Sequence, residues 1–194
     1  MSLGTLVLEN ERCLLRPLEL GDGRLLQDAA FSKPNLLEFS PSSIHTEELL
    51  QAYVDSALQS RTEGLRYPFI IFDKLHGKYA GSTSYGNPSF KDQRVEIGWT
   101  WIGSAFQRTG LNRNIKFLML RYGFEVLDLQ RIELKTDVRN MQSREAMKKI
   151  GAIEEGILRS HTVMQDGFRR DTIYYSILAD EWSLIKSSIF QSFS

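Results

Sequence analysis

Apolar residues recur along the chain with two spacings, one typical of strands and one typical of helices. Short runs with strand spacing, bounded by turn residues, predict strands over 13–15, 67–72, 78–85, 94–102, 131–136, 153–164 and 168–178. Stripes with helical spacing predict helices over 21–30, from Thr46 through Leu58, over 111–126, over 140–150 and from about Asp180 onward. The order β-α-α-β-β-β-α-β-α-β-β-α predicts an α/β domain whose mixed, mostly antiparallel sheet is flanked by helices, with a central β-α-β crossover.

Composition narrows the class of protein further. The 194 residues fit one domain over 1–194, and the 42% apolar and 25% charged fractions are those of a folded globular chain. A single cysteine excludes an internal disulfide, and with three scattered histidines we expect no metal site. No apolar run reaches the length of a membrane span, and the first residues lack a signal-peptide pattern. We therefore expect a cytoplasmic protein that does not bind membranes.

Charge is balanced overall but not locally. The chain carries 24 basic and 24 acidic residues, whereas residues 107–149 carry ten basic and five acidic ones. A neutral whole argues against nucleic-acid binding, which requires a broad basic face. A basic segment within the predicted crossover suits a small anionic ligand better.

The segment Gln107-Arg108-Thr109-Gly110-Leu111-Asn112 links the predicted strand over 94–102 to a helix. The first turn of a helix presents unpaired N–H groups and partial positive charge, which together bind phosphates. Arg108 and Arg113 add formal charge, and Gly110 allows close approach of the backbone to a ligand. The alternative is an ordinary helix start with Thr109 as its N-cap.

Further stretches follow in a recognisable order: Leu14-Leu15-Arg16-Pro17-Leu18, Glu96-Ile97-Gly98-Trp99-Thr100-Trp101, Arg131-Ile132-Glu133-Leu134-Lys135-Thr136-Asp137, Asn140-Met141-Gln142-Ser143-Arg144, Gly151-Ala152-Ile153-Glu154-Glu155-Gly156, Asp166-Gly167-Phe168-Arg169-Arg170-Asp171 and Tyr174-Tyr175-Ser176-Ile177-Leu178. With the 107–112 loop they resemble the GNAT acetyltransferases, and most of all the RimJ/RimL-like branch, which includes acetyltransferases of ribosomal-protein N-termini. The resemblance spans nearly the whole chain, up to Glu181-Trp182. It implies a GNAT-like fold and acetyl-CoA as cosubstrate.

The resemblance also implies which residues contact acetyl-CoA. The loop matches the family's Gln/Arg-x-x-Gly-x-Gly/Ala pyrophosphate loop, with Asn112 at a position where this branch usually has asparagine. The residues expected at the cosubstrate are Trp101, Ile102, Gln107, Arg108, Thr109, Gly110, Leu111, Asn112, Arg113, Asn140 and Ser143. Backbone N–H groups around Ile102 are expected to polarise the thioester carbonyl.

Two residues are candidates for catalysis. Glu96 is expected to remove the proton of the acceptor amine, directly or through water, although a salt-bridged strand residue is the alternative. Ser143 matches a serine that in some relatives lies near the sulfur of CoA, and a polar position in the first helical turn is its alternative. Asn140 resembles the asparagine that bonds the pantetheine arm, and it would also serve as an N-cap. Many family members have a tyrosine as general acid where this chain has Met147, which cannot donate a proton.

Other residues have structural interpretations beside functional ones. Because side chains alternate along a strand, Trp99 and Trp101 are expected to share one face, where they would form either a substrate wall or part of the core. One of Tyr174 and Tyr175 is expected to face the acceptor, His161 is a weaker candidate base, and Cys13 is expected to be a buried hydrophobe.

These observations predict an N-acetyltransferase in which the acceptor attacks bound acetyl-CoA directly. The acceptor is a primary amine, with a protein N-terminus as the first choice, and a homodimer is compatible with the sequence. The alternatives are an acetyltransferase for a small-molecule amine and a non-catalytic module that binds acyl-CoA. The segment from Ser32 to Ser43 and the closing hairpin are expected to decide the acceptor.

Overall fold

The computed structural model describes residues 5–193. Its strands are β1 (Leu8–Glu9), β2 (Cys13–Pro17), β3 (Arg66–Asp73), β4 (Lys78–Ser89), β5 (Arg94–Ile102), β6 (Arg131–Asp137), β7 (Ile153–Val163) and β8 (Arg169–Leu178). Its α-helices are α1 (Gly23–Ala30), α2 (Glu47–Thr62), α3 (Leu111–Glu125), α4 (Met141–Lys148) and α5 (Ala179–Ser188). Every strand and α-helix expected from the sequence is present; the two-residue strand β1 and three short 3-10 helices, Leu20–Asp22, Ser104–Phe106 and Gln191–Phe193, are additional.

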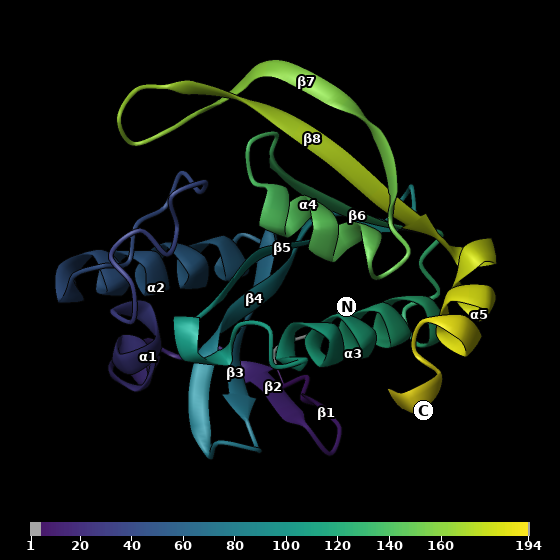
Figure 1. Cartoon of the computed structure of the whole chain (residues 1–194), viewed down its shortest axis with the longest axis horizontal. Helices are drawn as coiled ribbons and strands as arrows, with labels where there is room; N and C mark the ends of the chain where they lie inside the picture. Colours follow the sequence, from purple (N-terminus) through teal and green to yellow (C-terminus); the bar gives the residue numbers. More distant parts are fainter. Residues whose placement is uncertain (1–4, 194) are drawn as a thin grey trace.

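The strands form one sheet in the order β1-β2-β3-β4-β5-β6-β8-β7. Neighbours pair antiparallel except β5 and β6, which are parallel and connected through α3. The predicted mixed, mostly antiparallel sheet with its central crossover is therefore confirmed. Figure 1 shows the β7–β8 hairpin arching beyond the rest of the sheet.

Helices cover both faces of the sheet. On one face, Tyr53 of α2 donates a hydrogen bond to Ser82 of β4. On the other, Tyr85 of β4 donates to the carbonyl oxygen of Met119 in α3. Because positions 82 and 85 of one strand lie on opposite faces, α2 and α3 lie on opposite sides of β4. The buried core lies in the two layers between these helices and the sheet.

Local signals in the sequence fix several helix ends. The hydroxyl of Thr46 accepts from the N–H of Leu49 and caps α2, as its position predicts. Gly151 follows α4 with a φ of +89°, a conformation that glycine adopts without strain. Gly167 turns the β7–β8 hairpin with a φ of +81°.

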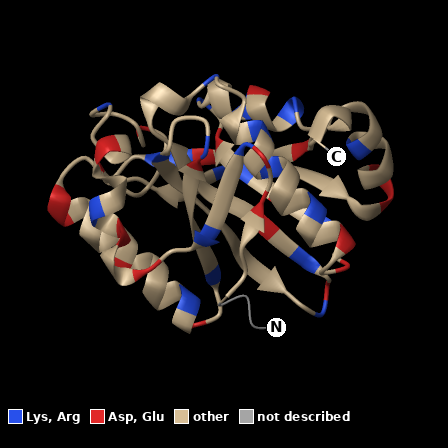
Figure 2. Ribbon diagram, turned by 90° about the horizontal axis from the view of Figure 1, so that it is seen from below, with Lys and Arg blue, Asp and Glu red and all other residues tan. Residues whose placement is uncertain are grey.

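The surface is mixed in charge. Lys and Arg alternate with Asp and Glu over the ribbon seen in Figure 2, and neither sign occupies a broad face of this view. Among residues 5–193, no helix is long and apolar enough to span a bilayer.

Candidate functional site

The parallel strands β5 and β6 separate soon after they meet. Their register covers three pairs, Arg94↔Arg131, Val95↔Ile132 and Glu96↔Glu133, and pairing ends there. Beyond this point, the edges of β5 and β6 face a gap in the sheet. Past these pairs, β5 leads into the 107–112 loop and β6 leads into α4.

A bulge in β5 contributes to the separation. The pairing with β4 shifts between Ser84↔Gly98 and Ser82↔Trp101, and Trp99 has a φ of +50°. The bulge does not separate Trp99 from Trp101: both lie on the face that α2 covers, Trp101 against Tyr53 and Trp99 against Arg66, which bonds Tyr53, so the shared face expected for them is confirmed. Trp101 is buried edge-on against Tyr53, as in the core interpretation, whereas Trp99 is 36% exposed.

The loop before α3 leaves a run of backbone donors free. Gly110, with a φ of +85°, is the N-cap residue of α3, and Arg108 also has a positive φ of 60°. Within the described chain, no group accepts the N–H of Arg108, Thr109 or Gly110. Successive free N–H groups at a helix start form a concave site for an anion.

Thr109 is not the N-cap, contrary to the structural alternative for this loop. Its hydroxyl donates to the carbonyl oxygen of Phe106 and does not bond the first turn of α3. The same hydroxyl accepts a 3.2 Å hydrogen bond from Arg12, which also pairs with Asp73. Arg12 is a cation beside the loop that the sequence did not indicate, because 97 positions separate it from Thr109.

Other basic and polar residues of the loop have defined contacts. Arg108 is exposed at the loop, whereas the guanidinium of Arg113 stacks on Phe190 and Phe193 and donates to the carbonyl oxygen of Ile189. Arg113 thus bonds the C-terminal segment. The amide of Gln107 donates to the carbonyl oxygen of Ile102 at 3.0 Å, so it holds the loop against the end of β5.

The start of α4 lies across the gap from the loop. Asn140 Oδ1 accepts from the N–H of Ser143 at 3.0 Å, so the N-cap interpretation of Asn140 is confirmed, and its Nδ2 makes no hydrogen bond to residues 5–193. Gln142 reaches Gln107 at 3.4 Å and connects the two sides. The hydroxyl of Ser143 has no partner among the described residues, whereas Met147 is buried in the core.

Glu96 lies where β5 and β6 part and is 4% exposed. Its Oε2 accepts from Asn87 at 2.8 Å and pairs with Lys135 at 2.8 Å, as the structural alternative for this residue supposes. Its Oε1 has no partner in the described chain and lies over Gly98, where a Cβ would come within 2.6 Å. One carboxylate oxygen therefore remains free to accept a proton.

A buried lysine lies near Glu96 on the other face of the sheet. Lys116 of α3 is 7% exposed and donates to the hydroxyl of Thr100 at 2.9 Å, which bonds Thr83 at 2.7 Å. Burial lowers the pKa of Lys116 from 10.5 to about 7, and the negative charge of Glu96 opposes that shift. The sequence did not single out Lys116, because its apolar neighbours gave it the pattern of an ordinary core helix.

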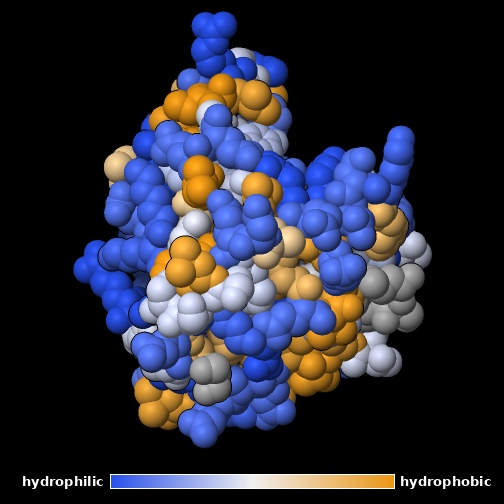
Figure 3. All heavy atoms as spheres, turned by 90° about the vertical axis from the view of Figure 1, so that its right-hand side faces the viewer, coloured by the Kyte–Doolittle hydropathy of each residue, from blue (hydrophilic) through white to orange (hydrophobic). Residues whose placement is uncertain are grey.

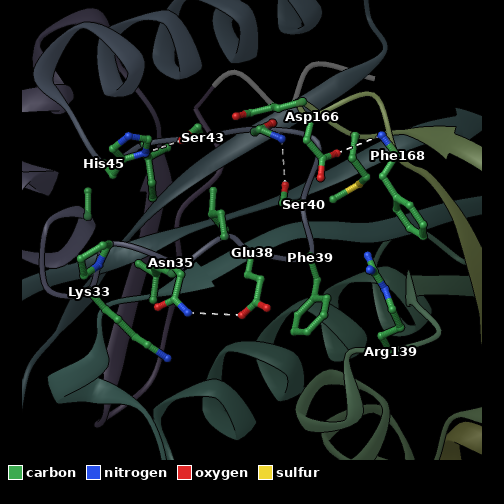
Figure 4. A pocket seen from close by; sticks show the side chains of 18 residues that line it. Lys33, Asn35, Glu38, Phe39, Ser40, Ser43, His45, Arg139, Asp166 and Phe168 are labelled. Atoms are coloured by element: carbon green, nitrogen blue, oxygen red, sulfur yellow. Dashed lines mark hydrogen bonds between the residues drawn. The ribbon is translucent and has the colours of Figure 1, made fainter.

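The segment between α1 and α2 and the β7–β8 turn line a half-open cavity of about 360 Å³. Gln165 of the turn donates to the carbonyl oxygen of Pro41, and Arg170 of β8 donates to that of Phe39. Figure 4 shows Arg139 near the rings of Phe39 and Phe168, whose centroids lie 5.7 and 4.3 Å from its guanidinium carbon. The two segments that sequence analysis linked to the acceptor therefore share one cavity wall.

The hairpin tyrosines face opposite sides. Tyr174 is half-buried beside His161, with the Lys135 ammonium 5.7 Å from its ring centre. Tyr175 is fully buried and bonds Glu154 and Arg144. His161 itself is exposed on β7. Cys13 is fully buried, which raises the pKa of its thiol to about 12 and confirms it as a core residue.

The chain resembles known acetyltransferases in sequence and in structure. A family model described as an acetyltransferase (GNAT) domain matches residues 12–153. The uncharacterized N-acetyltransferase YnaD of Bacillus subtilis is 28% identical over 180 residues, which are 89% of this chain and 97% of YnaD. YdaF of the same organism, provisionally named a ribosomal N-acetyltransferase, is 33% identical over 106 residues, or 55% of this chain and 57% of YdaF. The crystal structure of a GCN5-related N-acetyltransferase from Brucella melitensis superposes with a TM-score of 0.89 at 26% identity, covering 97% of this chain and 86% of that one.

Proposed function

Since the chain belongs to the GNAT acetyltransferase family, we propose that it moves the acetyl group of acetyl-CoA to a primary amine by direct attack within a ternary complex. The observation that carries this proposal is the run of free N–H groups at Arg108, Thr109 and Gly110, placed at the mouth of the gap between β5 and β6. This arrangement suits a pyrophosphate followed by a long polar arm.

The residues present fit acetyl-CoA. We assign the pyrophosphate to the loop from Gln107 to Asn112, with Arg108 as the cation there. The free Nδ2 of Asn140 and the backbone of Trp101 and Ile102 face the pantetheine arm from the two sides of the gap. Arg113 remains a proposed contact, but its bond to Ile189 means that it must turn to reach a phosphate. Arg12, beside Thr109, is a further cation available to the loop.

The chemistry follows from these positions. The amine nitrogen must lose a proton to expose its lone pair, and the free Oε1 of Glu96 is the base that we assign to this step. The nitrogen then bonds the thioester carbonyl carbon, the C–S bond breaks and its electron pair leaves with sulfur. On becoming an amide the nitrogen loses a second proton. We assign Ser143 to relaying that proton, directly or through water, to the departing sulfur, since Met147 cannot donate. Positioning within the gap and the N–H groups around Ile102 supply the rest of the rate enhancement.

A protein N-terminus is the acceptor class that we favour, on the RimJ/RimL-like motifs and the partial similarity to YdaF. The cavity walled by the 33–45 segment and the hairpin gives such an acceptor room beyond its amine. A small-molecule amine is the second candidate, since the same cavity would enclose one. A non-catalytic acyl-CoA-binding module is the third, and the buried Met147 in place of an acid is the observation that favours it.

A homodimer is also proposed. β7 is an edge strand, and Ile153, Ile157, Leu158 and Val163 are about half exposed on it. On the face that carries α5, apolar atoms likewise emerge between polar ones in Figure 3. Leu184 of α5 is 72% exposed. Sedimentation velocity distinguishes a monomer from a dimer.

The acceptor class is tested with a panel of N-terminal peptides and small amines, in which release of the CoA thiol is followed. Turnover with peptides but not with small amines supports the first candidate, and the reverse supports the second. Tight acetyl-CoA binding without turnover on any amine would support the third and contradict the proposed activity.

A further inference from the structure

Two arginines near Glu96 are buried without a carboxylate partner. Arg66 of β3 is 4% exposed and Arg170 of β8 is 7% exposed. Among the described residues, no carboxylate oxygen lies within 4.0 Å of either guanidinium. A buried charge without a counter-ion is costly, and such groups concentrate at sites that bind a charged ligand.

Arg66 is held in place by neutral groups. Its Nε donates to Ser84 and its Nη2 to Tyr53, and its guanidinium carbon lies 5.1 Å from the Tyr53 ring centre and 4.9 Å from that of Trp99. These contacts orient the guanidinium but do not neutralise it. Nη1 makes no hydrogen bond to the described chain and is not sealed from solvent.

Arg170 shows the same pattern on the hairpin. Its Nη1 donates to the carbonyl oxygen of Phe39, and its buried Nε has no partner in the part of the chain that the structure describes. Nη2 makes no hydrogen bond to that part either, and it is not sealed from solvent. Asp137 and Glu96 are near Arg170 and offset part of its charge, but Asp137 is already bonded by Arg139 at 2.6 Å and Glu96 by Lys135 at 2.8 Å.

Arg66 lies on the same face of the sheet as Glu96, the proposed base. Arg170 lies on β8, in the hairpin assigned to the acceptor. Arg66, Gly86 and Glu96 are successive cross-strand partners on β3, β4 and β5, so they share a face, with the Trp99 ring over Gly86. Two strand spacings separate Arg66 from Glu96, about 10 Å of backbone. Arg170 precedes Thr172, which pairs with Asp137 at the open end of β6, and it contributes to the wall formed with Phe39.

The charges around Glu96 therefore sum to an excess of cations. Lys135 is balanced by Glu96 and Arg139 by Asp137, which leaves Arg66 and Arg170 unbalanced. A diamine or polyamine would bring more positive charge to this face and be repelled. An amine that also carries an anion would pair with one of the arginines while its nitrogen reaches Glu96.

We propose that the acceptor is an anionic amine, a primary amine that carries a carboxylate or phosphate bound by one of these two arginines, whose strands β3 and β8 are separated by β4, β5 and β6. This inference rests on the proposed acetyl transfer and specifies its substrate class. The shared chemistry is the anion, whether it belongs to a small molecule or to an acidic peptide. Charge-assisted bonds of this kind contribute about 1.5–3 kcal/mol, which corresponds to roughly a ten- to hundredfold preference over a neutral amine.

The test compares kcat/KM for ω-amino carboxylates, ω-aminoalkyl phosphates, acidic tripeptides, n-alkylamines and α,ω-diamines of matched length. We expect the wild-type enzyme to prefer the anionic acceptors by roughly ten- to hundredfold, and at least one of Arg66→Gln and Arg170→Gln to reduce that preference severalfold or more. The anionic series with the highest kcat/KM shows whether the anion belongs to a small carboxylate, a small phosphate or an acidic peptide. A wild-type enzyme that prefers neutral amines or diamines would overturn the proposal.

Controls separate this effect from misfolding. Turnover of the neutral amine by the same variant is an internal reference, and Arg66→Lys retains the charge if Arg66→Gln does not fold. Arg94→Gln is the matched control, since Arg94 is ion-paired with Glu133 and should not affect the preference. An Arg66→Gln enzyme with an unchanged anion preference, together with an unchanged Arg170→Gln enzyme, contradicts the assignment.

A binding readout keeps the inference testable if no amine is turned over. Calorimetry on the CoA-saturated protein should show that N-acetyl ω-amino carboxylates bind and that N-alkylacetamides of the same length bind at least about tenfold more weakly. Arg66→Gln or Arg170→Gln should remove that difference. Absence of turnover on every amine would contradict the proposed function alone, whereas equal binding of both ligands would contradict the anion site alone.

Discussion

Gly110 adopts a left-handed backbone conformation where the free N–H groups of the loop meet the start of α3. A Cβ at this position meets no atom within 4 Å, so a side chain has room but would point into the region assigned to the pyrophosphate. Gly110→Asp should lower the affinity for acetyl-CoA more than about tenfold, because a carboxylate competes with the phosphate for the same donors.

Calorimetric titration with acetyl-CoA measures this effect. Gly64→Asp is the matched control, since Gly64 also has a positive φ of 72° and an open Cβ position but follows α2. It should bear the same backbone strain and bind normally. Equal affinities of the Gly110 variant and the wild type would rule out the loop as the pyrophosphate site.

Glu96 is the residue on which proton removal depends in this account. Glu96→Gln can still accept the hydrogen bond from Asn87, so the fold should persist while the base is lost. We expect kcat to fall by about 10²–10⁴-fold, acetyl-CoA affinity to stay nearly unchanged and the acidic limb of the pH–rate profile to flatten. Ser143→Ala should act more weakly, within about tenfold, because water can replace a hydroxyl donor.

Steady-state kinetics across pH give both readouts. Glu133→Gln serves as control, since Glu133 is the cross-strand partner of Glu96 and pairs with Arg94 and Arg131. If Glu96→Gln keeps a near-normal kcat and an unaltered profile, the amine loses its proton to solvent before it binds.

The β7–β8 hairpin presents its two tyrosines to different surroundings, and this separates their expected effects. Tyr174→Phe should raise the acceptor KM and leave the acetyl-CoA KM unchanged, because Tyr174 lies beside Lys135, which pairs with Glu96. Tyr175→Phe should leave both constants unchanged but lower Tm by about 2–6 °C, because it removes the bonds to Glu154 and Arg144.

Kinetics and thermal unfolding of the two single variants check this division. If neither variant alters the acceptor KM, the hairpin has a structural or dimerisation role and does not form part of the acceptor wall.

Elements were more predictable from the sequence than the contacts between them. Thr46, Gly151 and Gly167 mark ends and turns through local chemistry, and they lie where the pattern placed them. The bulge at Trp99 was missed, because a shift in pairing depends on β4 and leaves no mark on the alternation of β5. Arg12 beside Thr109 and the unpaired Arg66 were missed for the same reason, since only the folded sheet brings their neighbours together.

At the scale of the whole molecule, the buried Lys116 should make stability depend on pH. Its pKa is lowered from 10.5 to about 7 in the folded protein, so between these values the unfolded chain binds more protons. The free energy of unfolding should therefore rise with pH from about 7 to 10.5, by up to about 1.4 kcal/mol per pH unit from this residue. Below pH 7, Lys116 adds no further pH dependence to the free energy of unfolding.

Urea unfolding at several pH values between 7 and 10 measures the slope for wild type and Lys116→Met. The variant should show a flatter dependence, whereas Lys149→Met, which alters an exposed lysine, should follow the wild type. Parallel curves for wild type and Lys116→Met would show that Lys116 does not titrate as its burial requires.

Direct acetyl transfer within a ternary complex is the central claim, and the stoichiometry of one reaction tests it most directly. Free CoA thiol, acetylated amine and the intact mass of the protein are quantified by mass spectrometry in the same samples, with and without acceptor. The account predicts no thiol release without acceptor, equal amounts of thiol and acetylated amine with it, and no acetyl group on the protein. Thiol release without acceptor, an acetylated protein that forms before the product, or no transfer to any amine would contradict it.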